Sequence, residues 1–234
     1  MGIRQSIGWA TRTWNPVTGC WGPGGTEKQP NRCFYCYARR MAKRLRGLFG
    51  YPEDDPFVPT FHPARLSEPS EWKNPGRVFV CSMGDLFGDW VDSSWIERIL
   101  EKARTNPGHT FLFLTKNPGR YRAFEFPENC WLGATAVDDH SSYHNTVELA
   151  GMNNITFISY EPLLSPVHMN DGKLRWIDWV IIGAMTGPAA KQYAPKKEWI
   201  EDIVCEAKRL NMPVFMKDNL RPYWGGKLIQ EYPG

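Results

Sequence analysis

Short apolar runs recur along this chain from residue 77 onward, and they limit the choice of fold more than any other feature. They are rich in Val, Ile, Phe and Trp, and they are mostly continuous rather than alternating with polar residues. Such runs are typical of parallel strands covered on both faces. They span residues 77–83, 109–116, 130–137, 155–162, 178–184 and 213–217. The pattern therefore predicts a parallel β-sheet that is buried on both sides.

Amphipathic helical segments lie between these runs, at 93–105, 141–151 and 196–211. A further strand is expected around residues 8–14, and a short helix follows at about 38–46. Right-handed crossovers close such a β-then-α series into a barrel, and 234 residues approach the roughly 250 of a complete eightfold one. We therefore expect an α/β fold, namely a single-domain, TIM-barrel-like, parallel (β/α) partial barrel of about six to seven strands.

Two expectations concern the loops. The Pro-rich stretch 52–75 is expected to be a long loop with at most one turn of helix. Trp14, Trp21 and Trp90 stand in polar, glycine-rich contexts, which makes them candidates for lining the mouth of the barrel.

Composition and charge indicate the surroundings of the protein. No apolar run approaches the ~18 residues of a membrane span, and the N-terminus lacks the apolar core of a signal peptide. We therefore expect a cytoplasmic protein with no membrane partner.

With six cysteines and no export signal, free thiols are expected rather than a disulfide framework. The net charge of +3 permits an acidic partner without demanding one.

Three cysteines near the N-terminus, Cys20, Cys33 and Cys36, carry the strongest chemical signal. Two are separated by two residues, and the third stands across a Gly/Pro-rich loop of twelve, a length that closes at small entropic cost. A structural zinc site needs four protein ligands, whereas an iron–sulfur cluster used in catalysis can be held by three. The triad therefore favours a cluster. A zinc site completed by His62 or by a fourth cysteine is the alternative.

Polar or small residues follow nearly every expected strand. Active sites of parallel barrels lie at the C-terminal mouth, where residues from several strands converge. The candidate ligand-binding residues are Ser82, Asp85, Thr115, Thr135, Ser159, Glu161 and Gly183, with Tyr35 beside the cysteines and Lys116 and Lys217 also at strand ends. Several have a plain structural alternative. Asp85 can cap a turn, Glu161 can satisfy the backbone at a strand end, and Tyr35 can pack against the barrel.

The chain resembles a phage and prokaryotic family of three-cysteine proteins of uncharacterised function. That family is regarded as radical S-adenosylmethionine (SAM)-like and as distantly similar to spore photoproduct lyase. The resemblance covers about residues 9–217 and rests on the order and spacing of TWNPVTGC, CFYCYARRMAKRL, FVCSMGDLF, FLFLTKNPGR, WLGATAV, SYEPLL and DWVIIGAMTGP.

The resemblance implies a [4Fe–4S] cluster on the three cysteines, with SAM bound at its open iron. An external donor would supply one electron, and cleavage of the SAM sulfonium would release a 5′-deoxyadenosyl radical that acts on an unknown substrate. In such a site Asp85 would take the SAM ammonium and Tyr35 would face adenine, while Thr135 or Ser159 would bind ribose or carboxylate.

One departure from the expected pattern stands after the strand 178–184. Gly183, Ala184 and Met185 occupy the place where a glycine-glycine-glutamate run is expected. If that glutamate contacts a ligand in relatives, this chain lacks the contact or replaces it.

The substrate class is the least constrained part of the interpretation. A basic cluster follows the cysteines and comprises Arg39, Arg40, Lys43, Arg44 and Arg46. Together with the likeness to a DNA-lesion lyase, it favours a nucleic acid or a nucleotide, although a solvated helix face is the simpler explanation. The alternative function is a non-catalytic nucleic-acid-binding phage protein that zinc or a cluster stabilises.

Overall fold

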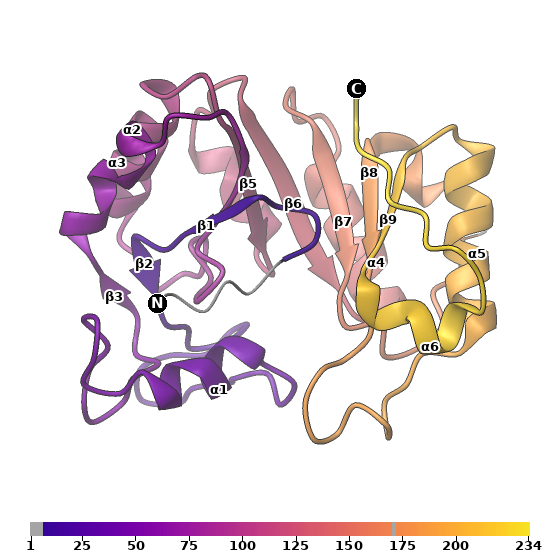
Figure 1. Cartoon of the computed structure of the whole chain (residues 1–234), viewed down its shortest axis with the longest axis horizontal. Coiled ribbons are helices and arrows are strands. Elements are labelled where there is room, and N and C mark those ends of the chain that lie inside the picture. The colour runs from indigo at the N-terminus through magenta and orange to yellow at the C-terminus, as the bar shows by residue number, and fades with distance from the viewer. Residues whose placement is uncertain (1–6, 170–171) are drawn as a thin grey trace.

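The main sheet of the computed structural model, which describes residues 7–169 and 172–234, contains seven strands. All seven are parallel, in the spatial order β1-β4-β5-β6-β7-β8-β9. They are β1 (Arg12–Trp14), β4 (Arg77–Val80), β5 (Thr110–Thr115), β6 (Cys130–Ala136), β7 (Thr156–Tyr160), β8 (Trp179–Ile182) and β9 (Val214–Met216). The sheet curls into a half-barrel (Figure 1), which confirms the predicted α/β partial barrel.

The longer helices lie outside this sheet, and α1 lies apart from them, beside the cysteine loop (Figure 1). They are α1 (Tyr37–Arg44), α3 (Ser93–Arg104), α4 (Asp139–Leu149) and α5 (Lys197–Arg209), and a short α6 (Arg221–Trp224) follows β9. None of the helices in the described chain is both long and apolar enough to cross a membrane.

The four predicted helices are confirmed, and side-chain caps define where two of them begin. α4 begins at Asp139 rather than at residue 141, because the Asp138 side chain caps the helix in a reciprocal pair with Ser141. α3 begins at Ser93, as predicted, and is capped by Asp92, whose carboxylate accepts the N–H of Ser94.

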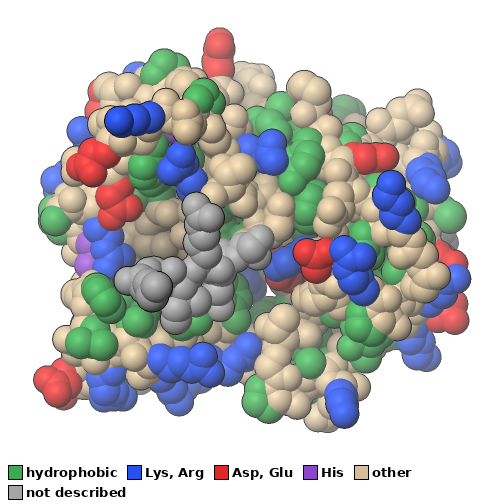
Figure 2. All heavy atoms as spheres, in the orientation of Figure 1, with side chains coloured by type: hydrophobic (Ala, Val, Ile, Leu, Met, Phe, Trp, Pro, Cys, Tyr) green, Lys and Arg blue, Asp and Glu red, His purple; other side chains and the backbone are tan. Residues whose placement is uncertain are grey.

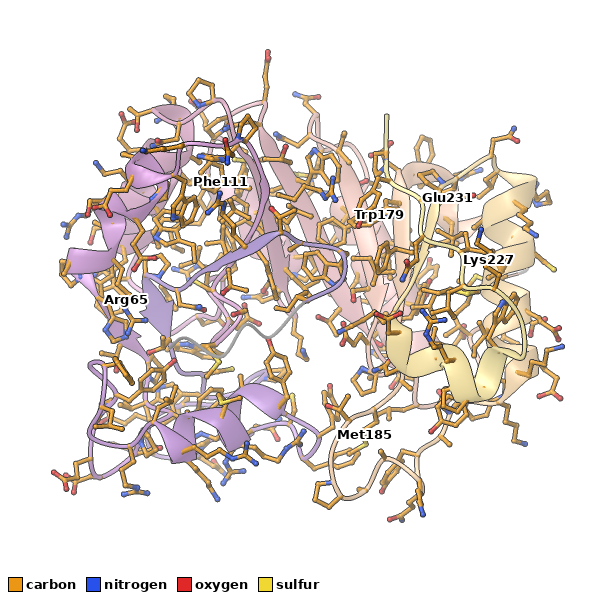
Figure 3. The ribbon with its side chains drawn as sticks, viewed as in Figure 1. Arg65, Phe111, Trp179, Met185, Lys227 and Glu231 are labelled. Atoms are coloured by element: carbon orange, nitrogen blue, oxygen red, sulfur yellow. The ribbon has the colours of Figure 1, made fainter. Side chains whose placement is uncertain are left out.

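Side chains from alternate positions along the strands form two separate apolar layers. The outer layer packs between the sheet and the helices and includes Val78, Val80 and Phe111. The inner layer fills the hollow of the half-barrel with Trp9, Phe79, Leu112, Phe157, Trp179, Ile181 and Phe215. Figure 3 labels Phe111 and Trp179 from these two layers. Because both faces of the sheet are buried, the strands appear in the sequence as continuous apolar runs.

The Pro-rich stretch 52–75 is more structured than expected, so its prediction as a loop with one helical turn is wrong. β3 (Thr60–Phe61) pairs antiparallel with β2 (Val17–Thr18). A 3₁₀ helix (Pro63–Ser67) and α2 (Glu68–Glu71) follow it directly. A proline stands in the first turn of each helix, where its missing N–H costs no hydrogen bond.

The two ends of the described chain cover the open side of the half-barrel, between its edge strands β1 and β9. The Tyr232 hydroxyl donates to the Gly8 carbonyl over 3.3 Å, and the Arg77 guanidinium lies 3.8 Å from the centre of the Tyr232 ring. Gln230 forms an antiparallel bridge with Phe215 on β9. The C-terminal segment therefore extends the sheet at β9 and reaches back to the other edge.

Candidate functional site

A cavity of about 450 Å³ opens at the C-terminal ends of the parallel strands. Most of the candidate residues share its wall. The cysteine loop contributes Cys20, Cys33, Tyr35 and Cys36, and the strand ends contribute Ser82, Asp85, Thr115, Lys116, Thr135, Glu161 and Lys217. Residues far apart in sequence meet here because the C-terminal ends of barrel strands converge.

The backbone before the first cysteine is anchored next to β4. The N–H of Gly19 donates to the Met83 carbonyl over 2.9 Å, and the N–H of Cys20 donates to the Phe57 carbonyl over 3.0 Å. Gly19 has a φ of 84°, and a Cβ there would lie 2.1 Å from the Val58 carbonyl oxygen. Only glycine fits this position, and Cys20 is held against the cavity as a result.

The twelve residues between Cys20 and Cys33 form a closed excursion. The N–H of Asn31 donates to the Trp21 carbonyl over 2.7 Å, so the two ends of the excursion meet. At this neck Gly22 has a φ of 85°, and a Cβ on it would lie 1.9 Å from the Asn31 carbonyl oxygen. The long spacing therefore does not separate the first cysteine from the other two.

Arg32 supports the same loop from inside. Its Nε donates to the Cys20 carbonyl over 3.2 Å, and its guanidinium lies 4.8 Å from the centre of the Trp21 ring. It also forms a salt bridge with Asp55. Burial favours a raised pKa for Asp55, but the hydrogen bonds from Arg32 and the backbone outweigh it, and the pKa lies below its usual value. Sequence analysis did not single out Arg32, although an arginine beside a cysteine motif was the available signal.

The three thiols are free of disulfide bonds. The sulfur atoms of Cys20 and Cys36 each accept a backbone N–H, over 3.2 and 3.4 Å. Burial raises the pKa of both thiols, and the charge of Asp85 raises that of Cys20 further, while Lys116 lowers both. The N–H donors and the lysine would stabilise thiolates once a metal replaces the protons.

A site for a single metal ion is not assembled from these side chains. Within the described residues, no three or more His, Cys, Asp or Glu side chains are arranged to hold a metal ion. His62, the suggested fourth zinc ligand, has its Nε2 in a 2.8 Å hydrogen bond with the Thr18 hydroxyl. The geometry therefore does not favour a zinc site completed by His62.

Asp85 joins the ends of β4 and β5. Its Oδ1 accepts the Thr115 hydroxyl over 2.6 Å and the N–H of Phe87 over 3.2 Å, and its Oδ2 accepts the N–H of Lys116 over 3.0 Å. The carboxylate thus caps a turn and also lines the cavity. Oδ2 retains the capacity to accept a further hydrogen bond from a ligand.

Glu161 and Lys217 form an ion pair at the ends of β7 and β9, in the part of the cavity away from β4. β8 lies between these strands, and Gly183 at its end leaves the necessary space. A Cβ on Gly183 would lie 3.0 Å from the Lys217 Cδ and 3.2 Å from the Glu161 Cγ. Gly183 is not itself part of the cavity wall; what it contributes is room for the pair.

Thr135 and Ser159 are paired neighbours on β6 and β7. Thr135 lines the cavity, whereas Ser159 is fully buried and is not part of the wall. The Ser159 hydroxyl has no hydrogen-bond partner among the described residues. An unpaired buried hydroxyl costs about 1–3 kcal/mol, so a bound group that reached it would be stabilised there.

The aromatic residues beside the cysteines have different roles. Tyr37 is partly buried, and its hydroxyl donates to the Ser82 carbonyl over 2.5 Å, which connects α1 to the end of β4. The Ser82 hydroxyl in turn donates to the Asn15 side chain over 3.1 Å. The Tyr35 ring lines the cavity, and the Lys116 ammonium lies 5.9 Å from its centre. Tyr37 lines the cavity as well, with its hydroxyl already bonded to Ser82, so both tyrosines are placed beside a bound ligand.

The loop after β8 contributes residues beyond Gly183 to the site. Met185 and Thr186 line the cavity, and Figure 3 shows Met185 beside α1. The Arg40 guanidinium donates to the Thr186 carbonyl over 2.9 Å and to the Tyr35 carbonyl over 3.2 Å. Arg40 thus joins this loop to the cysteine loop, a contact between distant segments that has no local sequence signal.

The tryptophans expected at the mouth lie elsewhere, so that expectation is wrong. Trp14 is buried in the outer core and donates to the Arg65 carbonyl over 2.7 Å. Trp21 and Trp90 are not part of the cavity wall either. Trp9, which sequence analysis did not single out, lines the cavity from the inner layer.

The chain matches a known protein-family model. A model described as "Protein of unknown function (DUF5131)" matches residues 4–228. The chain belongs to this family. No curated protein matches it.

A solved structure similar to this chain is described as "Spore photoproduct lyase complexed with dinucleoside spore photoproduct". The two share 11% sequence identity with a TM-score of 0.55, over 86% of this chain and 75% of that one. The distant likeness to spore photoproduct lyase is therefore confirmed at the level of the fold.

Proposed function

We propose that this protein is a radical SAM-type enzyme in which Cys20, Cys33 and Cys36 hold a [4Fe–4S] cluster. One observation carries the proposal: three free thiols, brought together by a closed excursion, share a cavity with charged and hydroxyl side chains at the mouth of a parallel half-barrel. The fold likeness to spore photoproduct lyase and the motifs that resemble radical SAM-like proteins support the same conclusion.

The donor set fits a cluster better than a single ion. Around one zinc ion all sulfur atoms must lie about 2.3 Å from the same point, whereas each cysteine of a cubane cluster binds a different iron atom. Three thiols that share a cavity without converging on a point are compatible with the second arrangement. A cluster on three cysteines leaves one iron open for a small molecule.

The remaining residues would bind and orient SAM. Asp85 would accept a charge-assisted hydrogen bond from the ammonium group of SAM. The Lys116 ammonium would pair with the carboxylate of SAM. Tyr35 presents a ring face to adenine, while Thr115, Thr135 and Ser82 supply polar groups. The unpaired Ser159 hydroxyl stands next to Thr135 on the neighbouring strand, and a bound group that reached it would satisfy it.

When bound and reduced by an external electron donor, the cluster would supply one electron that cleaves SAM to methionine and a 5′-deoxyadenosyl radical. The Glu161–Lys217 pair lies away from Asp85, and we assign it to orienting the ligand in that part of the cavity. Glu161 also provides a carboxylate next to Gly183. This carboxylate lies near Met185, the residue that replaces the glutamate of the expected glycine-glycine-glutamate run.

The test is anaerobic reconstitution with iron and sulfide. The wild-type chain should bind about four irons and four sulfides, and Cys20→Ala, Cys33→Ala and Cys36→Ala should each lose the cluster. Cys205→Ser is the matched control, because Cys205 is an exposed thiol on α5 away from the cavity. Reduced wild-type protein should also form 5′-deoxyadenosine from SAM without any added substrate.

Two outcomes would contradict the proposal. Full iron in Cys20→Ala would show that the excursion delivers no ligand. About one zinc per chain, with no iron uptake after reconstitution, would favour the non-catalytic alternative.

A further inference from the structure

We propose that a single nucleic-acid strand binds across the mouth of the half-barrel, with its phosphates along α1 and a base stacked on Phe34. This deepens the proposed function by naming a substrate class for the same cavity, and it rests on that function only for the chemistry that follows binding. The argument uses charge, aromatic contacts and the position of the cavity.

The charge comes from α1, which contains four basic residues and no acidic one. Lys43 and Arg44 are exposed, and neither forms an ion pair with another described residue. Figure 2 shows Lys and Arg side chains gathered along the lower edge of the molecule, over the position of α1 in Figure 1. Exposed cations on one surface are the electrostatic requirement for binding a phosphate backbone.

The basic residues of this cluster are not equivalent. Arg40 is used in joining the two loops, and Arg46 donates to the backbone carbonyls of Glu53 and Asp54. The carboxylates of Glu53 and Asp54 are the nearest acidic groups in sequence, while Asp55 is paired with Arg32. Lys43 and Arg44, which have no such partners, are therefore the groups we assign to phosphate.

An aromatic series leads from this surface into the cavity. The Phe34 side chain is 59% exposed, and its ring lies 5.0 Å from the Tyr193 ring and 5.2 Å from the Tyr35 ring. Tyr35 belongs to the cavity wall. Exposed aromatic rings beside basic side chains are the means by which proteins bind single strands, because every base can stack on them. A base on Phe34 would stand at the entrance of the cavity.

A single strand suits this arrangement better than a duplex or a membrane. A base can enter a cavity only after it has left its stack, which costs least when the strand is unpaired. An anionic membrane would also be attracted by α1 and by the exposed Phe49, but no lipid surface would use the aromatic series that ends inside the cavity. DNA and RNA share the chemistry proposed here, so the experiment includes both.

The test is fluorescence anisotropy of the full-length protein with labelled 15-mers of thymidylate and of uridylate at several salt concentrations. Binding should weaken with a slope of about −0.7 per phosphate contact. Lys43→Glu/Arg44→Glu should reduce affinity at least about tenfold and make the slope shallower, because two contacts are lost. Phe34→Ala should reduce affinity by about five- to a hundredfold with the slope unchanged, because stacking does not involve counterions.

The matched control is Lys208→Glu/Lys227→Glu, which makes the same charge change at two exposed residues away from α1, Lys208 on α5 (Figure 1) and Lys227 after α6 (Figure 3). It should bind like the wild type. Preference for either 15-mer identifies the strand as DNA or RNA. The inference is overturned if neither 15-mer binds in a salt-dependent way, if the two double variants are equally weakened, or if a duplex or anionic phosphatidylserine vesicles bind more tightly than both strands.

Iron content and 5′-deoxyadenosine formation, measured on the same preparations without nucleic acid, keep the two proposals apart. Strand binding with the expected variant pattern but no iron would contradict the radical SAM function alone. A full cluster with SAM cleavage but no strand binding would contradict this inference alone.

Discussion

Asp85 performs two tasks with one carboxylate. It accepts hydrogen bonds from the Thr115 hydroxyl and from the N–H groups of Phe87 and Lys116, and it forms part of the cavity wall. The structural and functional interpretations of this residue are therefore not exclusive, because the turn that it caps is also what points it at the cavity.

We expect Asp85→Asn to weaken SAM binding by about 1.5–3 kcal/mol, the value of a hydrogen bond to a charged group. Calorimetric titration of the reconstituted protein with SAM measures the change. Asp92→Asn is the control, since Asp92 caps α3 in a similar turn and is not part of the cavity wall. Equal SAM affinity in both variants would mean that Asp85 caps its turn and does not bind SAM.

A second prediction at this scale concerns His62. Burial, assisted by the charge of Arg65, lowers the pKa of His62 to about 4. Because the unfolded chain binds this proton near pH 6.5, the stabilising effect of the neutral ring is complete above that pH. It is lost as the pH falls from 6.5 to 4, and we expect it to amount to about 1–2 kcal/mol given partial solvent access.

Urea unfolding of the metal-free protein at pH 7.5 and pH 4.5 measures this loss. His62→Gln should lose less stability on acidification than the wild type, because glutamine can hydrogen-bond to Thr18 without titrating. His144→Gln, on the outside of α4, should keep the wild-type difference. An identical loss in His62→Gln and wild type would refute the assignment.

At the scale of elements, the cysteine loop depends on its neck rather than on its length. Gly22 and Asn31 approach so closely that no side chain fits at residue 22, whereas a Cβ on Gly24, inside the excursion, would meet nothing within 4 Å. Both glycines have positive φ, so alanine is strained to a similar degree at either position.

We expect Gly22→Ala to open the neck and move Cys20 away from Cys33 and Cys36. Iron per chain after reconstitution should fall below about half of the wild-type value, because two thiolates do not hold a cluster that needs three. Gly24→Ala has the backbone strain without the clash and should bind iron normally. The same iron content in both variants would show that the neck does not position Cys20.

For the whole molecule, the edge strands of the half-barrel do not pair, and its chain ends cover the gap. Tyr232 contacts Gly8 and Arg77 on one side and packs on Trp179 and Phe215 of the inner layer, with ring centres 5.5 and 5.4 Å apart. The half-barrel therefore uses both termini of its described chain to shield the inner apolar layer from water.

We expect Tyr232→Ala to lower the free energy of unfolding by about 1–3 kcal/mol, because the ring packs against two inner-layer aromatics. Tyr232→Phe keeps the ring, loses only the hydrogen bond to Gly8, and should cost about 0.5–1.5 kcal/mol. Urea unfolding followed by circular dichroism gives both values. A Tyr232→Ala protein as stable as the wild type would mean that the C-terminal segment does not contribute to closing the barrel.

Sequence by itself determined the seven parallel strands, the four longer helices and the class of the fold. These depend on local propensity and on burial of both faces of the sheet, which leave continuous apolar runs and amphipathic segments in the chain. It also indicated many of the polar residues of the cavity wall, because strand ends of a parallel barrel converge in any such fold.

Only the tertiary structure decided which candidates reach the cavity. Cys20 joins the other thiols through the Trp21–Asn31 contact, Gly183 makes room for an ion pair instead of lining the cavity, and Ser159 is fully buried outside the wall. Such outcomes depend on contacts between segments far apart in sequence. No local pattern indicates them, because each contact depends on the final packing of both segments and not on the residues next to it in the chain.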